Sequence, residues 1–154
     1  MLIARPEGWT ARRWRIERED GELVAALEVP LLREGGRLVI GDRIHRVERE
    51  GLMSGPWVLL DGDQLLFEAD KPSAIRNRFM VTVKGAPLEL SPTSWTLRSF
   101  RLVGPDWVEF GQIRRPSWLS RRVEIDLSDL VPLEAQLFLF VLAMVLWRRA
   151  DAGA

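Results

Sequence analysis

Few residues in this sequence have the type and spacing that catalysis or metal binding requires. His45 is the only histidine and cysteine is absent, which excludes thiolate catalysis, disulfides and metal sites built from several of these residues. His45 lies in an alternating, strand-like segment, where we expect it to point outward without a special role. Asp61-Gly62-Asp63 has the form of a metal-binding DxD, but strand-like sequence flanks it and Asp-Gly favours a hairpin turn.

Carboxylates and glycines give no stronger signal. Glu109 alternates with Val108 and Phe110, which predicts that its side chain points outward, and the paired carboxylates of a glycosidase are missing. Gly35-Gly36 precedes neither a helical pattern nor a Lys-Ser pair, so it is not a phosphate loop. No enzyme class is indicated, and we expect no catalytic residue, metal or cofactor.

The strongest local signal is a loop in which two pairs of arginines flank two large apolar residues. Each arginine close to an anionic membrane contributes about 1 kcal/mol of attraction to the headgroups. Tryptophan favours the membrane interface. The alternative is that the tryptophan caps one end of the fold and the arginines pair with nearby acids. The candidate contact residues are Arg114, Arg115, Trp118, Leu119, Arg121 and Arg122.

The overall charge gives no preference for nucleic acid or for membranes. The chain has 22 basic and 22 acidic residues, so any such attraction must be local, and we expect no nucleic-acid partner. Other arginines surround Trp14, but strand alternation divides them between two faces. We interpret that segment, 12–18, as a solvated edge strand. The N-terminal sequence lacks the pattern of a signal peptide, so we expect a cytoplasmic protein.

Turn signals recur along the chain and separate short strand-like segments. Leu23, Ala25 and Leu27 share one face, as apolar residues do in an antiparallel sheet with one wet and one dry side. The pattern predicts about eleven strands, at 12–18, 22–29, 37–40, 43–50, 57–60, 64–69, 79–84, 87–90, 95–103, 107–113 and 121–127.

The segment 132–149 has a different pattern and is typical of a helix. Pro132 suits a first helical turn, Glu134 suits the N-terminal end, and Arg148 and Arg149 suit the C-terminal end. Residues 137–147 are all apolar, so the helix has no polar stripe and must be surrounded by protein or by lipid. A membrane span needs about 20 apolar residues, which favours a buried helix over a tail anchor.

A large barrel accommodates both features, because it leaves a lumen in which an apolar helix is enclosed on all sides. We therefore predict a mainly β fold, a closed antiparallel barrel around the C-terminal helix. A pleckstrin-homology-like fold is the alternative, but its external helix should be amphipathic. We expect one domain over residues 1–150, with 151–154 as a disordered tail.

Several motifs resemble those of a known family. They are the crossover Ala69-Asp70-Lys71-Pro72-Ser73, then Gly111-Gln112-Ile113, then Arg121-Arg122-Val123-Glu124-Ile125-Asp126, followed by the apolar helix. Together they resemble the tubby C-terminal-like superfamily, and within it the phospholipid scramblase and LURP-one-related branch with its small bacterial members. The resemblance implies a barrel of about 12 strands, and it implies an association with membranes, since tubby proteins bind phosphoinositides and scramblases are membrane-attached.

The sequence departs from that family in three ways. It lacks the cysteine cluster that is palmitoylated in animal scramblases and their proline-rich N-terminal segment. In place of the scramblase calcium-binding stretch, residues 124–129 contain three acids, which are too few for calcium.

Two hypotheses follow for the function. The first is a non-enzymatic barrel that binds an anionic membrane surface, an anionic lipid headgroup or a protein partner, with peripheral attachment to the membrane. The second is a small-molecule carrier or enzyme with a pocket at a barrel mouth. Because the helix fills the lumen, we expect little cavity to remain for such a ligand. The oligomeric state is left open.

Overall fold

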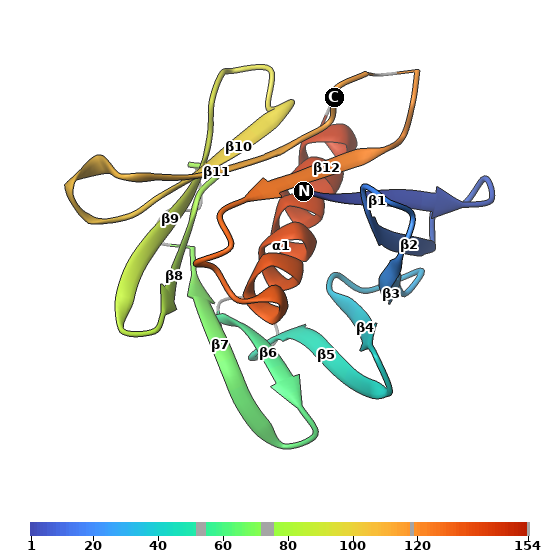
Figure 1. The fold of residues 1–154 in the computed structure, drawn as a ribbon, viewed down its shortest axis with the longest axis horizontal. Helices are drawn as coiled ribbons and strands as arrows, with labels where there is room; N and C mark the ends of the chain where they lie inside the picture. Colours follow the sequence, from blue (N-terminus) through green and yellow to red (C-terminus); the bar gives the residue numbers. More distant parts are fainter. Residues whose placement is uncertain (52–54, 72–75, 118, 154) are drawn as a thin grey trace.

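A computed structural model of the chain describes residues 1–51, 55–71, 76–117 and 119–153. Within them, twelve strands form a closed antiparallel barrel around one helix, α1, at Leu133–Ala152 (Figure 1). The predicted fold class is confirmed. The strands are β1 Leu2–Glu7, β2 Arg13–Arg18, β3 Leu23–Glu28, β4 Gly36–Ile40, β5 Arg43–Arg49, β6 Trp57–Asp61, β7 Gln64–Asp70, β8 Phe79–Val83, β9 Ala86–Pro92, β10 Ser99–Val103, β11 Glu109–Arg114 and β12 Val123–Leu127, and a short 3₁₀ helix, η1, lies at Pro105–Trp107.

The barrel is an up-and-down meander in which each strand pairs with its neighbours in the sequence and β1 pairs with β12 to close the ring. Because all pairs are antiparallel, successive connections alternate between the two ends of the barrel. β12 finishes at the end that holds the β2–β3 connection. From there α1 runs back through the lumen towards the other end, as Figure 1 shows.

Strand β1 was not predicted from the sequence. Its proline is tolerated because β12 pairs only with Leu2, Ile3 and Ala4, so Pro6 lies beyond the last β12 partner and pairs with β2 alone. The presence of β1 also corrects the interpretation of segment 12–18 as an edge strand. β2 pairs with β1 on one side and β3 on the other, because the closed barrel has no free edge.

The helix is buried on every side, as its sequence predicts. All residues from Ala135 to Trp147 are buried. The Phe140 ring meets Trp14 of β2 edge-on with 5.8 Å between ring centroids, while Phe138 stacks on Phe67 of β7 at 6.5 Å. These contacts point to different parts of the wall, which encloses the helix. Among the described residues, no helix has the length and hydropathy that crossing a membrane requires.

Candidate functional site

The β11–β12 connection, residues 115–122, carries most of the candidate contact residues. Two serines shape it, because Ser117 Oγ accepts a hydrogen bond from the Leu119 amide at 3.1 Å and Ser120 Oγ accepts one from the Arg122 amide at 3.4 Å. Leu119 is exposed. Trp118 lies outside the described residues, so its predicted contact with a membrane stays a prediction.

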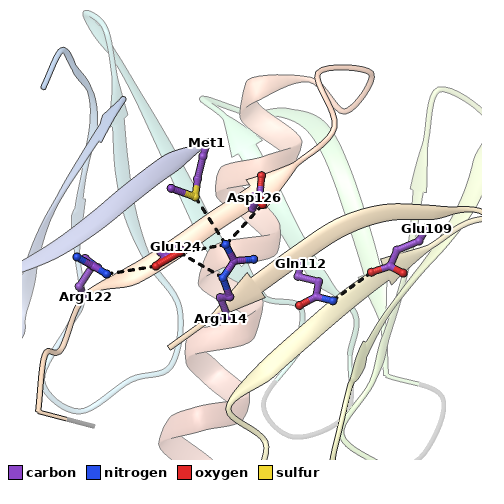
Figure 2. A network of polar contacts seen from close by, with 7 residues as sticks. All are labelled: Met1, Glu109, Gln112, Arg114, Arg122, Glu124 and Asp126. Carbon is purple, nitrogen blue, oxygen red and sulfur yellow. Dashed lines mark hydrogen bonds and ion pairs between the residues drawn. The ribbon is translucent and has the colours of Figure 1, made fainter. Parts of the chain in front are cut away.

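Arg114 and Arg122 belong to an ion-pair network on the outer wall of the barrel (Figure 2). Arg114 lies 3.1 Å from Glu124 and 3.5 Å from Asp126, and Arg122 lies 3.3 Å from the other oxygen of Glu124. β11 and β12 place Arg114 directly opposite Glu124. For these two arginines, the alternative expectation of pairing with nearby acids describes the structure.

Arg115 turns towards the C-terminal end of α1. Its guanidinium lies 4.6 Å from the centroid of the Trp147 ring, a cation–π contact, and 3.6 Å from the Asp151 carboxylate. The helix was predicted to end at Arg149, but α1 extends to Ala152. Its last turn therefore contributes Asp151, which holds Arg115 and the β11–β12 connection in place.

Arg121 holds the β1–β2 connection against the β11–β12 connection. Its guanidinium donates hydrogen bonds to the carbonyl oxygens of Gly8 at 2.7 Å and Trp9 at 3.0 Å. Because both acceptors are neutral, Arg121 retains an uncompensated positive charge at this end of the barrel. Trp9 itself is 96% exposed.

The six connections at this end of the barrel carry a strong positive charge. Residues 8–12, 29–35, 50–56, 71–78, 93–98 and 115–122 together contain nine basic and two acidic residues. We call this the basic end. The opposite connections, residues 19–22, 41–42, 62–63, 84–85, 104–108 and 128–132, contain one basic and seven acidic residues, and form the acidic end. A chain without net charge thus folds into a strongly polarised molecule.

Ion pairs neutralise only some of the positive charges at the basic end. Arg78 pairs with Glu89 at 3.7 Å, and Arg149 of α1 with Glu34 at 2.7 Å. In the part of the chain that the structure describes, five arginines at this end have no carboxylate partner. They are Arg12, Arg33, Arg98, Arg121 and Arg148.

Exposed apolar side chains surround the same end. Sequence reasoning selected only the 114–122 loop, and it missed these other connections because they become neighbours only when the barrel closes. Trp95 was also included in the strand predicted at 95–103, but β10 begins only at Ser99, so Trp95 lies in the β9–β10 connection. Trp9 and Trp95 were the signal that the sequence offered. The exposed residues are Trp9, Leu31, Leu32, Trp95 and Leu119.

A pocket of about 620 Å³ opens at the basic end, between the last turns of α1 and four of the connections. Arg115 and Arg121 line it together with Arg12, Arg98 and Arg148. The expectation that little cavity remains was wrong here. α1 fills the lumen, but the long connections and the arginine side chains leave a hollow above the C-terminal part of the helix.

Lys71 reports the positive character of this end. Its pKa is lowered from the ordinary value of 10.5, first by burial and then by the positive charges of Arg149 and Arg49, with Glu34 opposing the shift. The cations come from α1 and β5. Lys71 lies in the β7–β8 connection, so α1, β5 and this connection each bring a positive charge to the same place.

The only histidine does not face outward as predicted. His45 is 3% exposed and lies on the inner face of β5, and its Nδ1 atom has no hydrogen-bond partner. The strand alternation was identified correctly, but the choice of inner face was wrong because Ile44 is exposed and His45 takes the inward position. Over the described ranges, no group of three or more histidine or acidic residues is placed to hold a metal ion.

Comparison of the chain with models of protein families, with curated proteins and with solved structures found no match.

Proposed function

We propose that this protein is a non-enzymatic module that docks its basic end on an anionic lipid surface, peripherally and on the cytoplasmic side. The observation that carries the proposal is the opposite charge of the two ends of a neutral barrel. Such a distribution attracts and orients the protein in the field of an anionic membrane, whereas the net charge alone would not.

Exposed aromatic residues at the basic end support insertion into the interface. Trp9 is 96% exposed and Trp95 is 92% exposed, and they lie on different connections. A tryptophan ring is most stable at the headgroup level, where its apolar body and its polar N–H are both accommodated. Arginines beside these rings supply the electrostatic attraction, at about 1 kcal/mol each close to the surface.

We also propose that the chain is related to the tubby C-terminal-like superfamily. A closed barrel of twelve strands around a C-terminal helix is the architecture that the resemblance to tubby-like proteins implies. This agreement supports placing the chain near the scramblase and LURP-one-related branch, for which a membrane association is typical. The likeness is one of architecture and diffuse motifs, so the membrane proposal depends on the basic end itself.

Cosedimentation with lipid vesicles tests the proposal. We expect the protein to bind vesicles of phosphatidylglycerol and phosphatidylcholine but not phosphatidylcholine alone, and to be released by salt. The double variant Arg33→Gln with Arg98→Gln removes two exposed charges from different connections. Each lost charge should weaken vesicle binding about fivefold. Arg101→Gln removes an equal charge from the exposed side wall of β10 and is the matched control.

The apolar contribution has its own matched pair. Trp107 is 83% exposed but lies at the acidic end. Trp9→Ala with Trp95→Ala should weaken vesicle binding, while Trp107→Ala should leave it unchanged. Equal binding to both kinds of vesicle, or an equal loss of binding in the double variant and in Trp107→Ala, would reject docking through the basic end.

A further inference from the structure

The 620 Å³ pocket at the basic end has a size typical of a small-molecule site, for which about 300–1,000 Å³ is usual. Connections β1–β2, β3–β4, β9–β10 and β11–β12 and the last three turns of α1 form most of its walls, and Trp14 of β2 and Val123 of β12 complete them. The site therefore depends on the closed barrel, and it lies where the proposed docking surface meets the buried helix.

The inner wall is apolar and held in place. Trp14, Val123, Met144 and Trp147 are buried and line the pocket. The Trp147 ring packs at 5.5 Å from Phe100, and its Nε1 donates a hydrogen bond to the Leu97 carbonyl. A wall whose rings are already fixed loses little conformational freedom when an apolar ligand enters.

The outer wall is cationic. Arg12, Arg98, Arg121 and Arg148 are exposed, and none has a carboxylate partner within the described ranges. Asp151, the acid that lines this pocket, lies 3.6 Å from Arg115 and is therefore engaged. Guanidinium groups bind phosphate and carboxylate oxygens through two parallel N–H donors, which makes an oxyanion the matching ligand.

We propose that this pocket binds one anionic amphiphile, with its phosphate or carboxylate headgroup at the outer arginines and a single alkyl chain along Trp14, Met144 and Trp147. The proposal goes beyond docking, because it assigns a stoichiometric site for a single molecule. It rests on the proposed function only for the source of the ligand, since a membrane docked at this end would present such lipids at the pocket.

Soluble single-chain probes test the site without a membrane. Decyl phosphate and decanoate, kept below their micelle concentrations, are titrated while the fluorescence of the tryptophans is followed, with calorimetry for stoichiometry. We expect saturable binding of at least one of them at one molecule per chain. Inorganic phosphate lacks the chain and decyl maltoside lacks the charge, and each should bind at least about tenfold more weakly, because it makes half of the contacts.

Arg98→Gln with Arg148→Gln removes two exposed pocket cations and should raise the Kd about tenfold or more. Arg101→Gln on the side wall is the matched control and should not change it. The inference is overturned if neither anionic probe saturates on the native protein, or if the double variant binds as tightly as the native protein.

The two proposals fail in different ways. Vesicle binding that depends on the basic end, without saturable binding of monomeric probes, rejects the pocket site and keeps docking. Monomer binding without vesicle binding rejects docking and supports the pocket as a carrier site.

Discussion

Glu124 is the residue on which the outer-wall network of Figure 2 depends. Its carboxylate contacts both Arg114 and Arg122, and its side chain is only 13% exposed. Exposed ion pairs contribute little, but a partly buried carboxylate shared by two cations contributes more. Its role is therefore structural, in contrast to the arginines that lack a carboxylate partner.

We expect Glu124→Gln to lower the free energy of unfolding by about 1–2 kcal/mol, measured by urea denaturation. Asp126→Asn is the comparison, because Asp126 meets Arg114 at a longer distance, 3.5 Å, and is more exposed. It should cost less than about 0.5 kcal/mol. Equal effects of the two changes would show that the network has no centre at Glu124.

His45 presents the opposite case, a buried polar residue whose Nδ1 atom has no partner. Replacing such a group by an apolar one of similar size can be neutral or stabilising, because the cost of burying an unpaired polar atom disappears. We expect His45→Leu to change the free energy of unfolding by less than about 1 kcal/mol, or to raise it. A loss of about 3 kcal/mol would assign the imidazole a role that its contacts do not show.

At the scale of elements, α1 is distinguished by having no exposed side along its central residues. Leu137, Phe138, Leu139 and Phe140 point in successive directions around the helix, and each is fully buried. In an amphipathic helix, one or two of four consecutive positions would face water and tolerate substitution.

We therefore expect alanine at each of these four positions to be strongly destabilising. Leucine-to-alanine changes should cost about 2–5 kcal/mol and phenylalanine-to-alanine changes about 3–5 kcal/mol, measured by denaturant unfolding. Four uniform losses would match a helix enclosed by the barrel. A periodic pattern with one tolerant position would contradict enclosure.

Gly111 shows how closely two strands approach at the wall of the barrel. It lies in β11 with φ of +116°, and an added Cβ would lie 2.1 Å from the Asp126 carbonyl oxygen of β12. Both the conformation and the space require glycine. Gly111→Ala should lower the free energy of unfolding by about 2 kcal/mol or more, whereas Gly85→Ala, with nothing near its Cβ position, should cost less.

The elements could be predicted where local pattern decides them, as for α1 and the alternating strands such as β12. β1 was not predicted because it contains Pro6. A proline is tolerated there only because the pairing of β1 with β12 ends at Ala4, which the sequence does not reveal. The inward position of His45 and the pocket also depend on tertiary structure. The charge of the connections was readable from the sequence, but its division between two ends appears only when the strand order is known.

For the molecule as a whole, the polarised charge has a consequence for stability at high pH. The pKa of Lys71 is lowered from 10.5, first by burial and then by Arg149 and Arg49. In the pH range just below 10.5 the unfolded chain therefore binds more protons at this residue, so stability rises with pH there. Lys71→Gln removes this contribution, so the variant should gain less stability than the native protein as the pH rises towards 10.5, measured by urea unfolding at a series of pH values. A larger gain in the variant would contradict the sign.

The two lysines also report which end meets a membrane, because Lys71 lies at the basic end and Lys84 at the acidic end. Both can be labelled as ¹³C-dimethyl lysines and observed by NMR. An anionic surface against the basic end should raise the lowered pKa of Lys71 towards 10.5, because nearby negative charge stabilises the protonated amine. Phosphatidylglycerol nanodiscs should therefore shift the Lys71 resonance and its titration midpoint while the Lys84 resonance stays in place, and phosphatidylcholine nanodiscs should shift neither. A shift confined to Lys84 would mean that the acidic end faces the lipid, which the charge of the connections forbids.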